Sequence, residues 1–99
     1  MSLALVGASH HTAPIEVRER FHVADDAAED FLARVRRRSS VRESVVLSTC
    51  NRSELYVGGG PWEEVAAAAR EALAEHAGMA PDEARPYLYA RQGREAALH

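Results

Sequence analysis

Two short strand-like segments separated by only four residues constrain this fold more than any other feature of the sequence. Residues 44–48 are apolar and β-branched, and residues 53–57 alternate polar with apolar before three consecutive glycines. The connection, Thr-Cys-Asn-Arg at 49–52, has hairpin length, and Asn51 tolerates the unusual backbone angles of a tight turn. The sequence therefore predicts two antiparallel strands with Cys50 at their turn.

Strands and helices alternate along the rest of the chain. The hydrophobic pattern and the turn residues predict a strand at 3–8, a short helical turn at 15–21, a helix at 25–38, a helix that starts at Pro61 and stops at Gly78, a strand at 87–89 and the start of a helix at 94–99. The order strand, helix, strand, strand, helix, strand is the split βαβ pattern of ferredoxin-like α+β sandwiches. We therefore expect a βαββαβ fold whose antiparallel sheet has its helices packed on one face.

Length and composition indicate an ordinary globular domain. The 99 residues suffice for one domain, 1–99, but not for a separate cofactor domain, and 46% of them are hydrophobic and 27% charged. No apolar run approaches the ~20 residues that span a bilayer, and the N-terminus lacks a basic region and a cleavage site. We expect a cytoplasmic protein without a membrane segment.

Cys50 is the single cysteine of the chain, so it cannot form an internal disulfide. A reactive cysteine needs exposure and a positive or hydrogen-bonding environment, because the thiolate is the nucleophile. Free cysteines are often buried, which favours an inert thiol. The polar neighbours Thr49, Asn51 and Arg52 favour a reactive thiol instead, displayed at a turn whose backbone amides can stabilise an oxyanion.

Other clusters point to weaker candidates. The net charge of −3 gives no global attraction to nucleic acid, so an RNA partner needs a local patch or another domain. The arginines between residues 34 and 42 form such a patch, although they also complement the negative end of a helix dipole. His10 and His11 are adjacent, which points their side chains apart, and no cluster has metal-ligand spacing with Cys50, so we predict no metal site.

Three segments of the chain closely resemble the N-terminal catalytic domain of glutamyl-tRNA reductase. They are residues 7–14 (Gly-Ala-Ser-His-His-Thr-Ala-Pro), 17–20 (Val-Arg-Glu-Arg) and 47–56 (Leu-Ser-Thr-Cys-Asn-Arg-Ser-Glu-Leu-Tyr). The resemblance runs from about Leu3 to the end, and Ser-Thr-Cys-Asn-Arg followed by Ser-Glu-Leu-Tyr is highly specific to that family. One departure is Ser9, where many relatives have Asn.

This resemblance implies an NADPH-dependent oxidoreductase that reduces glutamyl-tRNA to glutamate 1-semialdehyde, the first step of tetrapyrrole (porphyrin, 5-aminolevulinate) biosynthesis. It implies that Cys50 attacks the glutamyl ester, forms a thioester and frees the tRNA, after which hydride from NADPH releases the aldehyde. It also implies that Thr49, Cys50, Asn51 and Arg52 contact the substrate. The guanidinium of Arg52 suits a glutamate carboxylate because two donors meet two oxygens.

Two histidines receive roles from the same resemblance. His99 falls where the family has a histidine important for activity, although without the family it reads as a terminal surface residue. His10 matches a family position in the active-site loop, and on chemistry alone it is equally an ordinary hydrogen-bonded loop residue.

The resemblance covers part of the family's length. No Gly-x-Gly-x-x-Gly motif follows a strand, since residues 58–60 lack that spacing, so we expect the NADPH-binding and dimerisation domains to be absent and this fragment to bind no cofactor and to perform only acyl transfer. The implied partners are glutamyl-tRNA, the remaining domains of the full-length reductase and the downstream aminomutase. The alternative is a non-catalytic ferredoxin-like module for ligand binding or assembly.

Overall fold

A four-stranded antiparallel sheet forms the centre of the computed structural model, which describes residues 2–93. Its strands are β1 (Ser2–Ser9), β2 (Val41–Ser48), β3 (Arg52–Gly59) and β4 (Tyr89–Gln92), in the spatial order β2-β3-β1-β4. Both β1 and β2 pair antiparallel with β3, so they run in the same direction with β3 between them. This is the predicted split βαβ arrangement, and the ferredoxin-like fold is confirmed.

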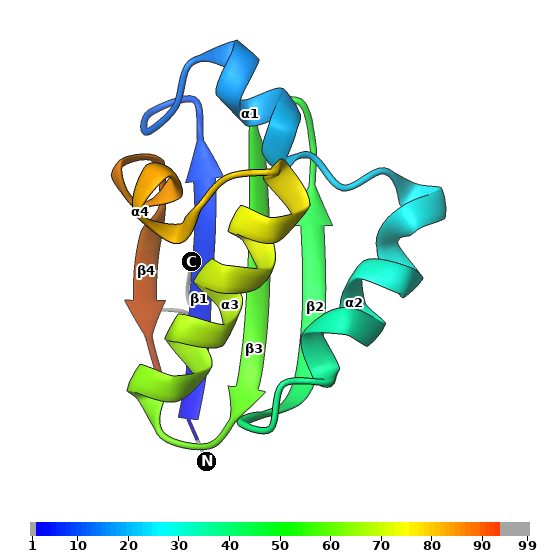
Figure 1. The fold of residues 1–99 in the computed structure, drawn as a ribbon, viewed down its shortest axis with the longest axis vertical. Helices are drawn as coiled ribbons and strands as arrows, with labels where there is room; N and C mark the ends of the chain where they lie inside the picture. The colour runs from blue at the N-terminus through cyan, green and yellow to red at the C-terminus, as the bar shows by residue number, and fades with distance from the viewer. Residues whose placement is uncertain (1, 94–99) are drawn as a thin grey trace.

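The helices cover one face of this sheet (Figure 1). They are α1 (Ile15–Phe21), the 3₁₀ turn η1 (Asp25–Ala27), α2 (Ala28–Arg36), α3 (Trp62–Ala77), α4 (Pro81–Ala84) and the 3₁₀ turn η2 (Arg85–Tyr87). The long helix α3 crosses β1 and β3, whereas α1 sits over the end of the sheet at which β1 and β2 finish (Figure 1). Gly78 ends α3 with a φ of 71°, as predicted, because glycine adopts this left-handed conformation without a Cβ clash.

Strand alternation divides the side chains of the central strands between the two faces. Ala4, Val6 and Ala8 of β1 belong to the hydrophobic core under the helices, together with Leu55 and Val57 of β3. Phe31 of α2 and Leu73 of α3 complete the core from the helix side. The intervening positions face away from the helices, where the sheet has no second helical layer among the described residues (Figure 1).

The helix predicted at 25–38 is shorter and less regular than expected. It opens with the 3₁₀ turn η1 and its α-helical part ends at Arg36. The chain then tightens, since the amide of Val41 donates to the carbonyl of Arg38 and leads directly into β2. The pairing of β2 with β3 shifts register between Val41 and Glu43, a β-bulge at the start of the strand.

The last strand starts two residues later than predicted. Residues 81–87 form α4 and η2, with Pro81 and Pro86 in their first turns. Proline lacks only an amide hydrogen that the first turn does not use, so these prolines begin helical turns rather than separate loops from a strand. Consequently Tyr87 lies in η2 and packs against the core, while Tyr89 begins β4 opposite Gly7.

Candidate functional site

The three segments that carry the family resemblance meet at one end of the sheet. The loop after β1, helix α1 and the turn between β2 and β3 all lie at the upper end in Figure 1. The amide of His10 donates to the carbonyl of Asn51 at 2.9 Å, which joins the loop to the turn. Among the described residues, no group of three or more His, Cys, Asp or Glu side chains is arranged to hold a metal ion.

Thr49 builds the turn that carries Cys50. Its hydroxyl accepts hydrogen bonds from the amides of Asn51 at 3.2 Å and Arg52 at 3.3 Å, and its own amide donates to the carbonyl of Arg52 at 2.7 Å. No non-glycine residue among 2–93 has a positive φ, so the expectation that Asn51 supplies unusual backbone angles is wrong. A side-chain hydroxyl closes the turn instead. Two turn amides expected to be available to an oxyanion are thereby engaged.

Cys50 is exposed, as a nucleophile must be. It borders a cavity of about 240 Å³, the Cys50 cavity, which Thr49 also lines. The other lining residues are Ile15, Arg18 and Glu19 of α1 and His22, which directly follows that helix. Ile15, which is 55% exposed, adds apolar surface to this cavity. The predicted nucleophile therefore faces a partly apolar hollow.

Arg52 faces a different hollow. It is the first residue of β3 rather than a turn residue, and its side chain is 40% exposed. It lines a cavity of about 180 Å³, the Arg52 cavity, whose other lining residues are Ser9, His11, Thr12, Tyr89 and Arg91. Side chains alternate along β3, and Leu55 points into the core under the helices, so Arg52 points to the opposite face. The Arg52 cavity therefore opens on the face away from the helices.

Glu54 is the functional candidate that sequence reasoning missed. Glu54 is fully buried. The hydroxyl of Tyr89 donates to its Oε2, and Nη1 of Arg52 lies 3.8 Å from its Oε1. Burial, followed by the hydrogen bond to Glu54, raises the pKa of Tyr89. Burial first and the charge of Glu54 second also raise the pKa of Tyr56.

The sequence held one signal for this burial. Gly7 lies opposite Glu54 and Tyr89, and a Cβ at Gly7 would stand 2.7 Å from the carbonyl oxygen of Ser53 and 2.9 Å from Cγ of Glu54. The Gly7 position is therefore closed to any side chain without a backbone shift. An alternating strand pattern alone places Glu54 in solvent, because it does not show what lies across the sheet.

Ser48 joins the hairpin to the end of α1. Its Oγ accepts the amide hydrogen of Val23 at 3.0 Å and lies 2.9 Å from Nδ1 of His22 and 2.8 Å from Oγ of Ser53, which is buried. The two walls of the Cys50 cavity are thus held to each other through one hydroxyl. His22 is exposed, as expected, but it is tied to this cluster rather than freely solvated.

The two remaining predicted residues have different outcomes. His10 is exposed and its ring lies 3.9 Å from that of His11, so the expectation that these side chains point apart is wrong. They lie in a turn, where strand alternation does not apply. His99 and the helix expected at 94–99 fall outside the described residues, so their roles stay predictions.

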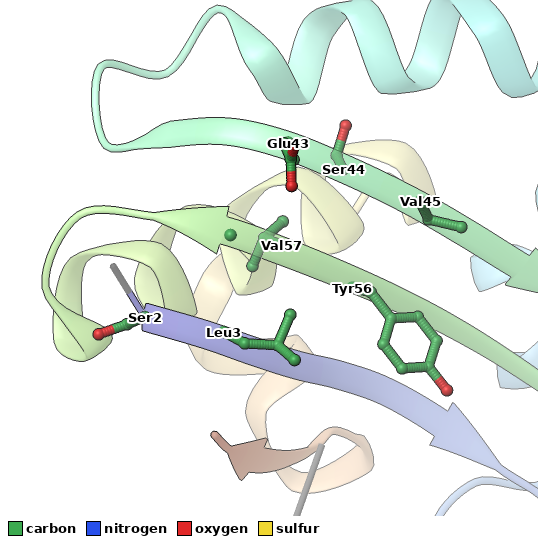
Figure 2. A pocket seen from close by; sticks show the side chains of 8 residues that line it. Ser2, Leu3, Glu43, Ser44, Val45, Tyr56 and Val57 are labelled. Atoms are coloured by element: carbon green, nitrogen blue, oxygen red, sulfur yellow. The ribbon is translucent and has the colours of Figure 1, made fainter. Parts of the chain in front are cut away.

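A larger cavity of about 380 Å³ lies away from this end of the sheet. Figure 2 shows Leu3, Val45 and Tyr56 among the side chains that line it. Val45 is 61% exposed. None of the candidate site residues of the sequence lines this cavity, so size alone does not identify the reactive site.

The comparisons with known proteins agree with the motifs. The chain matches the family model "Glutamyl-tRNAGlu reductase, N-terminal domain" over residues 6–99. Over all 99 residues it is 42% identical to a glutamyl-tRNA reductase of Synechococcus sp. (strain RCC307) and 35% identical to one of Syntrophotalea carbinolica. It spans 22% of the length of each of these relatives.

A solved structure with the same architecture is among the matches. It is titled "Putative antibiotic biosynthesis monooxygenase from Nitrosomonas europaea", with a TM-score of 0.55 and 15% identity over 94% of this chain and 96% of that chain. At this identity the likeness concerns the fold alone. The chemistry of the site must therefore be argued from the family and from the side chains at the hairpin turn.

Proposed function

Because the chain belongs to the glutamyl-tRNA reductase family and matches its N-terminal domain, we propose that it performs the acyl-transfer half of glutamyl-tRNA reduction. The observation that carries the proposal is the exposed Cys50 thiol at the edge of a cavity, on a turn that Thr49 holds in place. The pathway that this activity serves is tetrapyrrole biosynthesis.

Cys50 attacks the carbonyl carbon of the glutamyl ester as a thiolate. A carbon–sulfur bond forms and the ester carbon–oxygen bond breaks, with its electron pair passing to the ribose oxygen. That oxygen takes up a proton and the tRNA leaves. The glutamyl group stays on Cys50 as a thioester.

Arg52 recognises the glutamate side chain. Its guanidinium offers two parallel donors to the two oxygens of a carboxylate, and the Arg52 cavity lies beside the turn that carries Cys50. Glu54 lies 3.8 Å behind the guanidinium, within the sheet, and holds the arginine without occupying the cavity. Glu54 is therefore a positioning residue for the recognition of the substrate.

Thr49, Asn51, His10 and His99 keep supporting roles in the proposal. Thr49 fixes the turn through its hydroxyl, and Asn51 accepts the amide hydrogen bond of His10 through its carbonyl. Direct contacts of these residues with the glutamyl group follow from the family resemblance, and so does the catalytic role of His99.

NADPH does not fit the described residues. Dinucleotide sites of the common type lie at a glycine-rich turn between a strand and a helix of a parallel sheet, whereas this sheet is antiparallel. Gly59 serves packing, because a Cβ there would stand 2.1 Å from the carbonyl oxygen of Ser40. Full reduction then requires the further domains of the family.

Intact-mass spectrometry tests the proposal. Incubation of the chain with an activated glutamyl ester, without NADPH, is expected to add one glutamyl group at Cys50. Cys50→Ser is the matched control and should stay unmodified. An unmodified chain under conditions that acylate a small thiol, or equal modification of Cys50→Ser, overturns the acyl-transfer assignment.

A second measurement separates the two halves of the reaction. We expect the chain to show no NADPH oxidation that depends on glutamyl-tRNA, because the sheet of residues 2–93 is antiparallel and lacks the strand–turn–helix arrangement of the common dinucleotide site. Measurable oxidation would contradict this division of labour.

The alternative function is a non-catalytic module, and the cavity in Figure 2 favours it. This cavity of about 380 Å³ is partly apolar and lies on the sheet away from Cys50, as a ligand site unrelated to the thiol would. Loss of all acylation together with retention of a small-molecule ligand at Tyr56 would support it.

A further inference from the structure

Two cavities of different chemistry flank the hairpin turn, and only one of them suits the glutamyl side chain. We infer that the Cys50 cavity receives the terminal nucleoside of the tRNA while the Arg52 cavity receives the glutamyl group. This inference rests on the proposed function, because it divides one substrate between two hollows on either side of the nucleophile.

The two cavities lie on opposite sides of the hairpin. Arg52 belongs to the strand positions that face away from the helices, and the Arg52 cavity opens there. The Cys50 cavity is walled by α1, on the helix side. An ester carbon held at Cys50 therefore has its acyl part and its leaving group directed toward different hollows.

Charge separates the two ligands. The Arg52 cavity is lined by two guanidinium groups, those of Arg52 and Arg91, which suits an anion such as a carboxylate. The Cys50 cavity is lined by one cation, Arg18, and one anion, Glu19, which face a partly apolar space. Balanced charge suits a neutral ligand that carries both donors and acceptors, and a nucleoside is such a ligand.

Arg18 has hydrogen-bonding capacity that the protein does not use. Its Nη1 donates to the carbonyl of Ala13 at 2.9 Å, and its Nε is buried beyond the reach of a ligand, so only the outer end of the guanidinium can donate into the cavity. Arg20, two residues along α1, is engaged instead by the carbonyls of Ala77 at 3.0 Å and Gly78 at 3.1 Å and lies outside the cavity. Arg20 of the Val-Arg-Glu-Arg motif therefore links α1 to the end of α3, whereas Arg18 lines the Cys50 cavity.

The apolar part of the cavity supplies a surface for a base. Ile15 is 55% exposed at the rim and the imidazole of His22 lies in the lining. Histidine is among the side chains on which unstacked bases stack, and Ile15 adds apolar surface beside it. At about 240 Å³ the cavity is smaller than the roughly 300 Å³ at which sites for drug-sized ligands begin, so it suits a ligand no larger than one nucleoside.

The cavity is preformed. Ser48 fixes the end of α1 to the hairpin through the amide of Val23 and the ring of His22. The opposing walls therefore keep their separation without the ligand, which reduces the ordering cost of binding.

Two glutamyl esters test the inference. One is 3′-O-glutamyl adenosine, which carries the nucleoside, and the other is a glutamyl aryl ester, which does not. We expect Arg18→Gln to slow acylation of Cys50 by the nucleoside ester about ten- to a hundredfold, since a charge-assisted hydrogen bond is lost, and to leave the aryl ester reaction nearly unchanged.

Three companion variants sharpen the result. Ile15→Asn, at an exposed site where folding is not at stake, should slow the nucleoside ester selectively as well. Arg52→Gln should slow both esters equally, because both contain the glutamyl group. Arg20 lies outside the cavity, so Arg20→Gln is the control variant. It should react with each ester at the rate of the unsubstituted chain. Circular dichroism detects any loss of stability in this variant.

The outcomes separate this inference from the proposed function. Acylation by both esters with no selective loss in Arg18→Gln and Ile15→Asn overturns the nucleoside assignment alone. Absence of any Cys50 adduct in the unsubstituted chain overturns the proposed function and this assignment with it.

Discussion

The two faces of the sheet bury side chains for different purposes. On the helix side, β1 and β3 contribute Ala4, Val6, Leu55 and Val57, which are buried to 0% exposure among other apolar groups. On the opposite side the same strands bury Glu54, which binds Tyr89 and approaches Arg52. One face supplies the free energy of folding by apolar burial, whereas the other fixes polar groups beside Arg52, the residue that we propose binds the glutamyl carboxylate.

The comparison teaches that burial alone does not identify the role of a strand residue. Leu55 and Glu54 are neighbours in β3 and both are fully buried. Removal of the first leaves a cavity, whereas removal of the second leaves polar partners without one of their contacts. Substitutions on the two faces of the sheet separate these two kinds of cost.

The largest effect should come from the helix face. Leu55→Ala is expected to lower the free energy of unfolding by about 3 kcal/mol, because it removes a fully buried side chain and leaves a cavity. Urea unfolding followed by circular dichroism measures the change. Val45→Ala, on an exposed position of β2, is the control and should stay within about 0.5 kcal/mol. Equal losses in both variants would remove the distinction between the two faces.

On the polar face, the stability should depend on the hydrogen-bond partners of Glu54 rather than on the volume of its side chain. Glu54→Leu keeps a side chain of similar size but removes the acceptor of the Tyr89 hydroxyl. We therefore expect the free energy of unfolding to fall by about 2 kcal/mol. The double variant Glu54→Leu/Tyr89→Phe removes both partners and should recover most of that loss. A double variant as unstable as Glu54→Leu alone would show that packing, not the hydrogen bond, sets the cost.

A smaller effect is expected at the join between α1 and the hairpin. Ser48→Ala removes the acceptor of the Val23 amide and the contact with His22, and should cost about 1 kcal/mol of unfolding free energy. We also expect a lower rate of Cys50 acylation, because the two walls of the Cys50 cavity lose their link. Ser44→Ala, on the same strand, is the matched control, and an equal change in both variants would rule out a special role for Ser48.

The smallest effect concerns alkaline pH. Burial and the hydrogen bond to Glu54 raise the pKa of Tyr89 in the folded chain above its unfolded value. The stability linked to this shift is fully present below the unfolded pKa of about 10 and is lost as the pH rises above it. The unsubstituted chain should therefore lose more unfolding free energy than Tyr89→Phe between about pH 9 and pH 11. Parallel pH profiles for the two chains would contradict the shift.

Local sequence signals predicted the hairpin and the position of Cys50. The segments 44–48 and 53–57 are separated by so few residues that only an antiparallel turn connects them, and the observed strands extend both predictions. The prediction of α3 also used only local signals, since Pro61 and Gly78 flank the helix in the chain. Such features need no knowledge of distant residues.

Features that depend on distant contacts were not predicted. Glu54 is buried because Tyr89 and Gly7 lie beside it in the sheet, and strand alternation along β3 contains neither residue. The start of β4 was misplaced because Pro81 and Pro86 fit either a loop or the first turn of a helix. The separation of Cys50 and Arg52 into two cavities also requires the folded sheet, although they are two residues apart.

The bulge at the start of β2 also hinders edge-to-edge pairing between copies of the chain. β2 is an edge strand of the described sheet, and exposed edges invite pairing with strands of other chains. The register shift between Val41 and Glu43 interrupts the regular spacing of hydrogen-bonding groups, and the exposed charges of Arg42 and Glu43 stand at that irregularity. Aggregation by sheet extension is thereby discouraged at this edge, even though Val45 and Leu47 lie exposed nearby.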